Sequence, residues 1–119
     1  MSYDIHYTDK QGQQYELEEP MEEGGTHQLG GNTETWLNVT YNYSWYYHMF
    51  LDEEEGIRWL YGKTGGECVE RLKEAIEPFE GFMPYERDYW APTPGNCVQP
   101  LRIFLQWAQR WPDGRFEGD

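Results

Sequence analysis

The order of hydrophobic patterns along the chain predicts an α+β fold, with a small antiparallel sheet of three or four strands covered on one face by about three helices. Apolar and polar residues alternate in the first third of the chain, as in half-buried strands. From about residue 43 onward, apolar residues recur at helical spacing. Because the chain has 119 residues and no internal repeat, we expect a single α+β domain over residues 1–119.

Residues 3–18 are predicted to form a β-hairpin. The odd-numbered positions of both arms are apolar, namely Tyr3, Ile5, Tyr7, Tyr15 and Leu17. The residues between the arms include Gly12 and are typical of a turn. His6 falls on the polar side of the first arm, which favours a surface histidine over a ligand or a base.

The stretch from residue 30 to residue 50 changes its period halfway. Residues 34–41 alternate and predict a strand, whereas apolar residues from Tyr43 to Leu51 follow helical spacing. The join between them is dense in amides, hydroxyls and phenols. Since a helix start presents unpaired backbone N–H groups, polar side chains around it predict a binding surface. The alternative is a hydrogen-bond network internal to the fold.

Two further helices are predicted from their N-terminal residues. Thr64 and Glu67 match the capping box, followed by an apolar stripe that ends near residue 79. Thr93 and Pro94 match the N-cap and first position of the last helix. Pro100 then predicts either a kink in that helix or a start about one residue before the proline.

The composition limits the classes of partner. Nine basic and 22 acidic residues give a formal net charge of −13, which argues against direct binding to nucleic acid or to anionic membranes. There is no apolar run of the ~20 residues that a membrane span requires, and no basic-then-apolar start typical of a secretory signal peptide. We therefore expect a cytoplasmic protein in which Cys68 and Cys97 are reduced thiols of the core.

The sequence offers no recognisable catalytic or metal-binding motif, so no catalytic residue, metal ligand or cofactor is predicted. Its histidines and cysteines do not show the spacing of a zinc site: His6, His27, His48, Cys68 and Cys97. No GxSxG nucleophile motif, GxGxxG dinucleotide motif or phosphate loop occurs. The chain is more easily explained as a binding protein than as an enzyme.

Several motifs resemble those of a family of short, functionally uncharacterised proteins of tailed phages and prophages. The motifs are GGT at 24–26, GG.TE.WLNVTYNYS at 30–44, GIRWLYGKTG at 56–65, YW.PTPGN at 89–96 and PDG...GD at 112–119. The resemblance covers most of the chain. It implies a small protein that acts in the cytoplasm of an infected host cell, and it implies no activity.

The leading functional hypothesis is non-enzymatic binding of a small polar, nucleotide-type ligand. In a phage, such a protein would act as a sponge for a host defence signal. The predicted ligand-binding residues combine polar contacts, stacking rings and cations: Trp36, Asn38, Thr40, Asn42, Tyr43, Arg58, Lys63 and Trp90. For Arg58 the alternative is a structural salt bridge.

The alternative hypothesis is an acidic inhibitor that imitates nucleic acid and occupies the groove of a basic host defence protein. Residues 18–23 and 52–55 are acidic stretches that would face such a groove. A simpler explanation of the charge is solubility. By analogy with small binding proteins that build pockets across symmetric dimers, we also expect a homo-oligomer.

Overall fold

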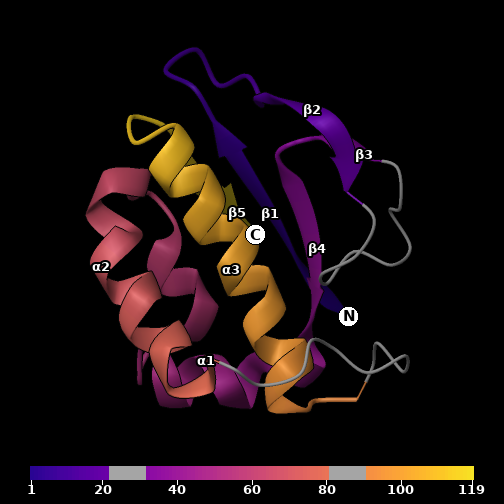
Figure 1. The fold of residues 1–119 in the computed structure, drawn as a ribbon, viewed down its shortest axis with the longest axis vertical. Coiled ribbons are helices and arrows are strands. Elements are labelled where there is room, and N and C mark those ends of the chain that lie inside the picture. Colours follow the sequence, from indigo (N-terminus) through magenta and orange to yellow (C-terminus); the bar gives the residue numbers. More distant parts are fainter. Residues whose placement is uncertain (22–31, 81–90) are drawn as a thin grey trace.

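The computed structural model describes residues 1–21, 32–80 and 91–119 and has an α+β architecture, as predicted (Figure 1). A three-stranded antiparallel sheet has the order β4-β1-β5, and a two-stranded sheet joins β2 to β3. The described strands are β1 (Ser2–Thr8), β2 (Glu16–Met21), β3 (Asn32–Glu34), β4 (Trp36–Thr40) and β5 (Arg115–Gly118). The described α-helices are α1 (Ser44–Phe50), α2 (Gly65–Ile76) and α3 (Pro94–Arg110), with short 3₁₀ helices at Tyr41–Tyr43, Gly56–Leu60 and Glu77–Phe79.

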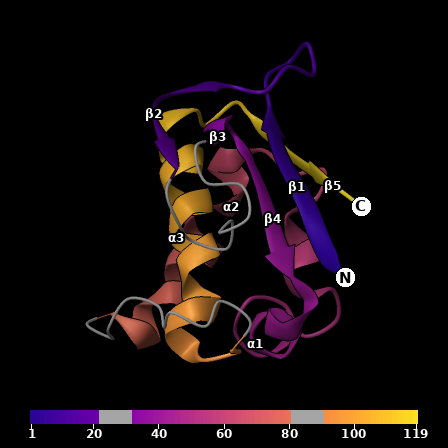
Figure 2. The ribbon, with the colours of Figure 1, turned by 90° about the vertical axis from the view of Figure 1, so that its right-hand side faces the viewer.

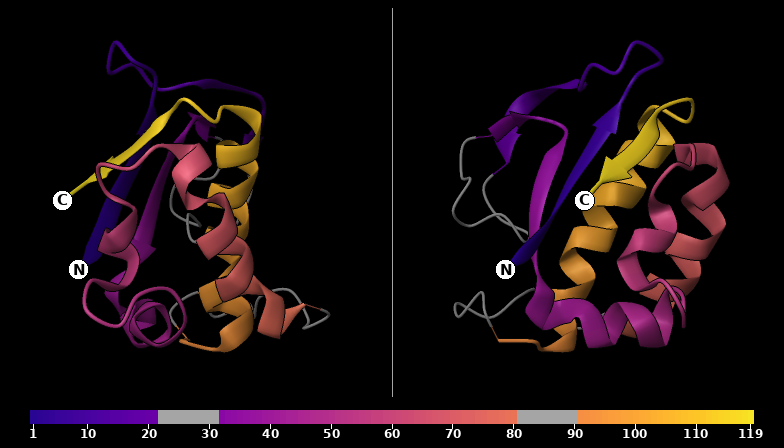
Figure 3. Two further views of the ribbon diagram at one scale, coloured as in Figure 1. Left: turned by 90° about the vertical axis from the view of Figure 1, so that its left-hand side faces the viewer. Right: turned by 180° about the vertical axis from the view of Figure 1, so that it is seen from behind.

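The helices cover one face of the three-stranded sheet and leave the other open (Figures 2 and 3). Alternation along the strands sends one set of side chains into the core, namely Tyr3, Ile5, Tyr7, Leu37, Val39 and Phe116. The intervening polar side chains of β1, β4 and β5 lie on the open face. The open face is where side chains of the sheet remain available to a partner.

The predicted hairpin over residues 3–18 is wrong in its pairing. β1 pairs with β4 and β5, whereas β2 pairs with β3. Thr35, which is fully buried, lies between the two arms: its hydroxyl donates to the Tyr7 carbonyl at 2.6 Å and accepts from the Tyr15 N–H at 3.0 Å. The two arms bridge each other directly at Thr8 and Gln14, next to the turn. Beyond that bridge, Tyr7 and Tyr15 bond to Thr35, which lies 28 and 20 positions later in the chain.

The predicted strand over residues 34–41 is divided at the same threonine. The backbone N–H of Thr35 donates to the Tyr15 carbonyl, and its carbonyl accepts from the Tyr7 N–H. The chain therefore leaves the β2-β3 sheet at Glu34 and enters the three-stranded sheet at Trp36. The predicted alternation holds across the division, since Thr35, Leu37 and Val39 are all buried.

The predicted helix boundaries agree closely with the structure. Thr64 and Glu67 form the capping box at the start of α2. Thr93 caps α3 through its side chain, and Pro94 occupies the first turn, so the later start near residue 99 is wrong. Pro100 lies inside α3 and is buried there. Its missing N–H and its ring are accommodated within a helix of 17 residues.

From their sequence, residues 26–29 could form a short strand, and residues 82–92 form a loop rich in aromatic residues and proline. The first stretch and most of the second lie outside the described residues. Within the described ranges, no helix is both long enough and apolar enough to cross a membrane.

Candidate functional site

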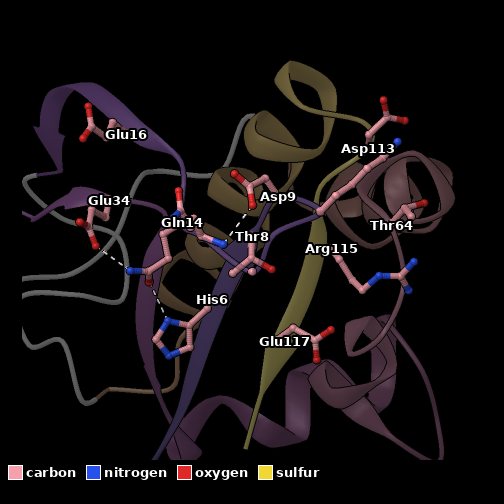
Figure 4. A pocket seen from close by; sticks show the side chains of 13 residues that line it. His6, Thr8, Asp9, Gln14, Glu16, Glu34, Thr64, Asp113, Arg115 and Glu117 are labelled. Atoms are coloured by element: carbon pink, nitrogen blue, oxygen red, sulfur yellow. Dashed lines mark hydrogen bonds between the residues drawn. The ribbon is translucent and has the colours of Figure 1, made fainter.

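A polar hollow of about 960 Å³ lies at the open face of the sheet, beside the turn that follows β1 (Figure 4). We call it the sheet-face hollow. Its lining comes from β1 and the turn after it, from β2 and β3, from the N-cap of α2, from the turn after α3 and from β5: His6, Thr8, Asp9, Lys10, Gly12, Gln13, Gln14, Glu16, Glu34, Thr64, Asp113, Arg115 and Glu117. Segments from both ends of the chain and from its middle therefore build one site.

The register of β1 and β5 positions the floor of the hollow. His6 is opposite Glu117 and Thr8 is opposite Arg115, all on the polar side of the sheet. Residues that pair across two strands have side chains on the same face, and so do residues two positions apart on one strand. These four side chains are therefore neighbours. The floor thus carries a carboxylate, a guanidinium, an imidazole and a hydroxyl.

A chain of side-chain hydrogen bonds forms one wall (Figure 4). Nδ1 of His6 lies 2.7 Å from Oε1 of Gln14, whose Nε2 donates to Oε2 of Glu34 at 2.6 Å. The amide oxygen of Gln14 accepts only, so His6 carries its proton on Nδ1. The His6 ring also stacks on Trp36, with 5.9 Å between ring centroids and 9° between planes.

The turn after β1 forms a second wall and is held by its own backbone. Oδ1 of Asp9 accepts from the N–H groups of Gln11 at 2.9 Å and Gln13 at 3.0 Å. Gly12 has a φ of 82°, a conformation that favours glycine. Since these bonds fix the turn, its polar groups are already in place when a partner arrives.

Carboxylates outnumber cations in the sheet-face hollow. The acidic residues are Asp9, Glu16, Glu34, Asp113 and Glu117, and the cations are Lys10 and Arg115. The guanidinium of Arg115 also donates to the Gly62 carbonyl, so part of its capacity is used within the fold. The hollow therefore suits a partner that supplies positive charge and hydrogen-bond donors.

Two of the predicted ligand-binding residues lie on the open face of the sheet near this hollow. Trp36 is half-buried and stacks on His6. Asn38 uses its side-chain amide internally, donating to Oγ of Ser2 and Oδ1 of Asp4, each at 2.7 Å. Trp36 and Asn38 thus extend the polar face but do not line the hollow.

The predicted residues at the strand-to-helix join are directed largely into the fold. Tyr43 is buried in the core, and Thr40 is buried as the cap of the Tyr41–Tyr43 helix. The Thr40 hydroxyl accepts from the Asn42 N–H at 3.2 Å, while the Asn42 side chain is exposed. None of these three lines the sheet-face hollow.

The two predicted cations rest on aromatic rings. The guanidinium carbon of Arg58 lies 4.9 Å from the ring centroid of Tyr3, and Nε donates to the Asp119 backbone oxygen at 3.0 Å. Nζ of Lys63 lies 4.3 Å from the ring centroid of Trp59 and donates to the Trp59 carbonyl. The predicted Trp90 lies outside the described residues. None of the seven described members of the predicted set lines the sheet-face hollow. Arg58 lies beside the strand-to-helix join, where its Nη2 donates to the Tyr41 hydroxyl at 3.3 Å.

The residues of the hollow that sequence analysis missed are mostly polar positions of strands. The sequence places His6 on the polar side of its strand, but it does not show which residues lie beside His6 in the sheet. The sequence signal for β5 is the alternation of Arg115, Phe116 and Glu117, and this signal is too short to predict a strand. Gln14 and Glu34 come together only because β2 pairs with β3.

The two cysteine thiols are buried in the core and are not accessible for reaction. Cys68 and Cys97 are free and fully buried. Burial raises the pKa of each thiol to about 12, so both are protonated at neutral pH. Within the described ranges, no group of three or more histidine, cysteine or acidic residues is placed to hold a metal ion.

Comparison of the chain with known protein families, with characterised proteins and with solved structures finds no match.

Proposed function

We propose that this chain is a non-enzymatic binding protein that presents the acidic, open face of its sheet to the basic groove of a nucleic-acid-binding protein. The observation that carries the proposal is the sheet-face hollow, in which five carboxylates gather from separate segments of the chain. Hydrogen bonds hold two of them in place, Asp9 in the turn and Glu34 in the wall. A preorganised acidic surface is what a basic groove would bind in place of phosphates.

The charge of the whole chain supports this proposal. A formal net charge of −13 creates a long-range field that attracts a basic partner and repels nucleic acid and other acidic proteins. Arg58 and Lys63 lie outside the hollow, on aromatic rings, and Arg115 donates to a backbone carbonyl. In the hollow, five carboxylates still outnumber the two cations Lys10 and Arg115. The negative field at the open face is therefore retained.

The resemblance of several motifs to those of phage and prophage proteins suggests where such binding would matter. A phage protein that occupies the groove of a host nuclease would protect phage nucleic acid in the host cytoplasm. The basic partner is therefore proposed to be a host defence protein.

Binding of a small nucleotide-type ligand is the second candidate, and the stacking of Trp36 on His6 favours it. A base could add to such a stack on the open face, a contact worth ~1–3 kcal/mol. The carboxylates of the hollow oppose a ligand that carries phosphates. This candidate therefore requires the bound base to provide most of the affinity.

A capture experiment at two salt concentrations tests the first proposal. The tagged protein is incubated with host lysate, and bound proteins are compared at low and high salt. We expect one basic nucleic-acid-binding protein that is lost at high salt, because its contacts are electrostatic. The double variant Glu16→Lys, Glu117→Lys should lose it, since both side chains are exposed in the hollow.

The matched control carries the same charge change away from the sheet. Glu70→Lys, Glu74→Lys alters exposed side chains of α2 and should retain the captured protein. Equal loss in both double variants would reduce the effect to net charge and overturn the assignment to the sheet face.

Calorimetry against cyclic dinucleotides and ADP-ribose derivatives tests the second candidate, the binding of a small nucleotide-type ligand. Trp36→Ala is expected to abolish any heat of binding.

A further inference from the structure

The exposed side of α1 carries an apolar patch that the fold does not cover. Trp45 is 41% exposed and Met49 is 67% exposed, one turn apart on the helix. Together with His48 and Glu53 they line a shallow hollow of about 430 Å³. We call Trp45, His48 and Met49 the α1 patch. It lies at the opposite end of the molecule from the turn after β1 (Figures 1 and 2).

A rigid acidic turn, residues 52–55, borders this patch. Oδ2 of Asp52 accepts from the backbone N–H groups of Glu54 at 3.2 Å and Glu55 at 2.8 Å. Oδ1 of Asp52 also lies 3.8 Å from a guanidinium nitrogen of Arg71. The carboxylate of Asp52 thus orders the backbone of the turn, whereas the side chains of residues 53–55 are exposed.

The patch and the turn are fastened to each other. Nδ1 of His48 donates to the Glu53 carbonyl at 3.0 Å. Gly56 closes the turn with a φ of 60°, and a Cβ built there would lie 2.9 Å from Nε2 of His48. The apolar side chains and the acidic ones therefore form a single surface whose geometry is set before any partner binds.

We propose that the α1 patch and residues 52–55 dock a basic amphipathic helix of a partner protein. Tryptophan and methionine are enriched at the centre of interfaces, and methionine adapts its shape to an apolar helix face. The carboxylates at the border would pair with lysine or arginine on the flanks of that helix. This surface is separate from the sheet-face hollow and does not depend on its function.

The charges of the chain select this occupant over two others. A second copy would bring an equally acidic turn and a net charge of −13 to the same interface. An anionic membrane would be repelled by residues 53–55. A basic helix alone satisfies both the apolar centre and the acidic border.

Fluorescence anisotropy with a labelled designed peptide tests the proposal. The peptide has about 18 residues, with leucine at helical i, i+3, i+4 and i+7 spacing and lysine on the flanks. A second peptide keeps the leucines and replaces each lysine by glutamate. We expect saturable binding of the basic peptide that weakens with salt, and no binding of the acidic one.

Variants locate the binding. Met49→Gln and the double variant Glu53→Lys, Glu54→Lys should each weaken it by about tenfold or more, because both halves of the surface contribute. These changes leave the core and the backbone bonds of the turn in place. Glu70→Lys, Glu74→Lys on α2 and Glu16→Lys, Glu117→Lys in the sheet-face hollow should bind as the wild type does.

Three results would overturn the proposal. The first is no binding of the basic peptide, or equal binding by the α1 variants. The second is sedimentation showing self-association that Met49→Gln removes, which would assign the patch to a second copy. The third is binding to vesicles of anionic phospholipid that the same variant removes, which would assign it to a membrane.

Discussion

The hydroxyl of Tyr7 on β1 donates a hydrogen bond to the backbone carbonyl of Trp111, 104 residues later, at the end of α3. The Tyr7 ring is fully buried, and its centroid lies 4.5 Å from that of Phe116 on β5. The first strand, the last helix and the last strand thus meet at one side chain. The floor of the sheet-face hollow lies on the other side of the same two strands.

Tyr7→Phe removes this hydrogen bond and keeps the ring. We expect the free energy of unfolding to fall by about 1 kcal/mol, because the Trp111 carbonyl still accepts from the Gly114 N–H. Chemical denaturation measures the change. Tyr15→Phe is the control, since Tyr15 stacks on Trp111 through its ring. An equal loss in both variants would contradict a specific role for the Tyr7 hydroxyl.

Gly65→Ala should destabilise the fold strongly, whereas Gly66→Ala should be tolerated. A Cβ on Gly65 would lie 1.9 Å from the Tyr7 hydroxyl and 2.8 Å from Cα of Ala108. On Gly66 the nearest atom is the Pro112 carbonyl oxygen at 3.4 Å. We expect a loss of about 3 kcal/mol for the first variant and a change within about 1 kcal/mol for the second. Thermal unfolding of the pair, measured side by side, gives the comparison.

Stability should decline at alkaline pH because the buried thiols resist ionisation. Burial raises the pKa of Cys68 and of Cys97 to about 12 in the folded chain, against 9.0 as the usual value. Their contribution is complete below pH 9 and is lost as pH rises toward 12, because only the unfolded state releases the protons. Between pH 9 and 12, each thiol lowers the free energy of unfolding by about 1.4 kcal/mol per pH unit.

The variant Cys97→Ala isolates one of these contributions. Its free energy of unfolding is lower at neutral pH because the side chain is smaller, but it should fall less steeply between pH 9 and 12. Denaturation curves at several pH values provide the slopes. Parallel slopes for wild type and variant would contradict the assignment to the thiol.

The capping box of α2 should make stability sensitive to acid. The backbone N–H and hydroxyl of Thr64 donate to the Glu67 carboxylate and lower its pKa below the usual 4.5. Stability from this contact is present above that usual value and is lost as pH falls through the lowered pKa. Glu67→Gln should remove this part of the acid dependence, as followed by circular dichroism.

Thr64→Ala removes the cap itself. We expect it to cost about 1 kcal/mol at neutral pH, because the N–H of Glu67 loses its side-chain acceptor and keeps only the Thr64 carbonyl. Thr64→Ser retains the hydroxyl and should be close to wild type. A large loss for serine would show that the threonine methyl group, and not the cap, provides the stability.

Helix starts and buried faces were predictable because they depend on neighbours a few residues apart. The capping box that begins at Thr64 spans four positions. The N-cap and the first residue of α3 are the adjacent Thr93 and Pro94. Alternation predicts the burial of Leu37 and Val39 on β4 but not that of Thr40, which is buried as the cap of the next helix. The candidate site was harder to predict. In the polar cluster predicted around residues 38–43, Thr40 and Tyr43 are buried, whereas Asn38 lies on the open face of the sheet and Asn42 is exposed.

Strand pairing and the sheet-face hollow depend on contacts between segments far apart in the chain. The residues before and after Gly12 look like a hairpin, yet buried Thr35 bonds to both arms and sends β1 to β4 and β5. A local pattern shows which side of a strand is polar, but not which strand will lie beside it. Acidity and helix boundaries thus follow from composition and short-range contacts, whereas the convergence of carboxylates follows from long-range packing around Tyr7.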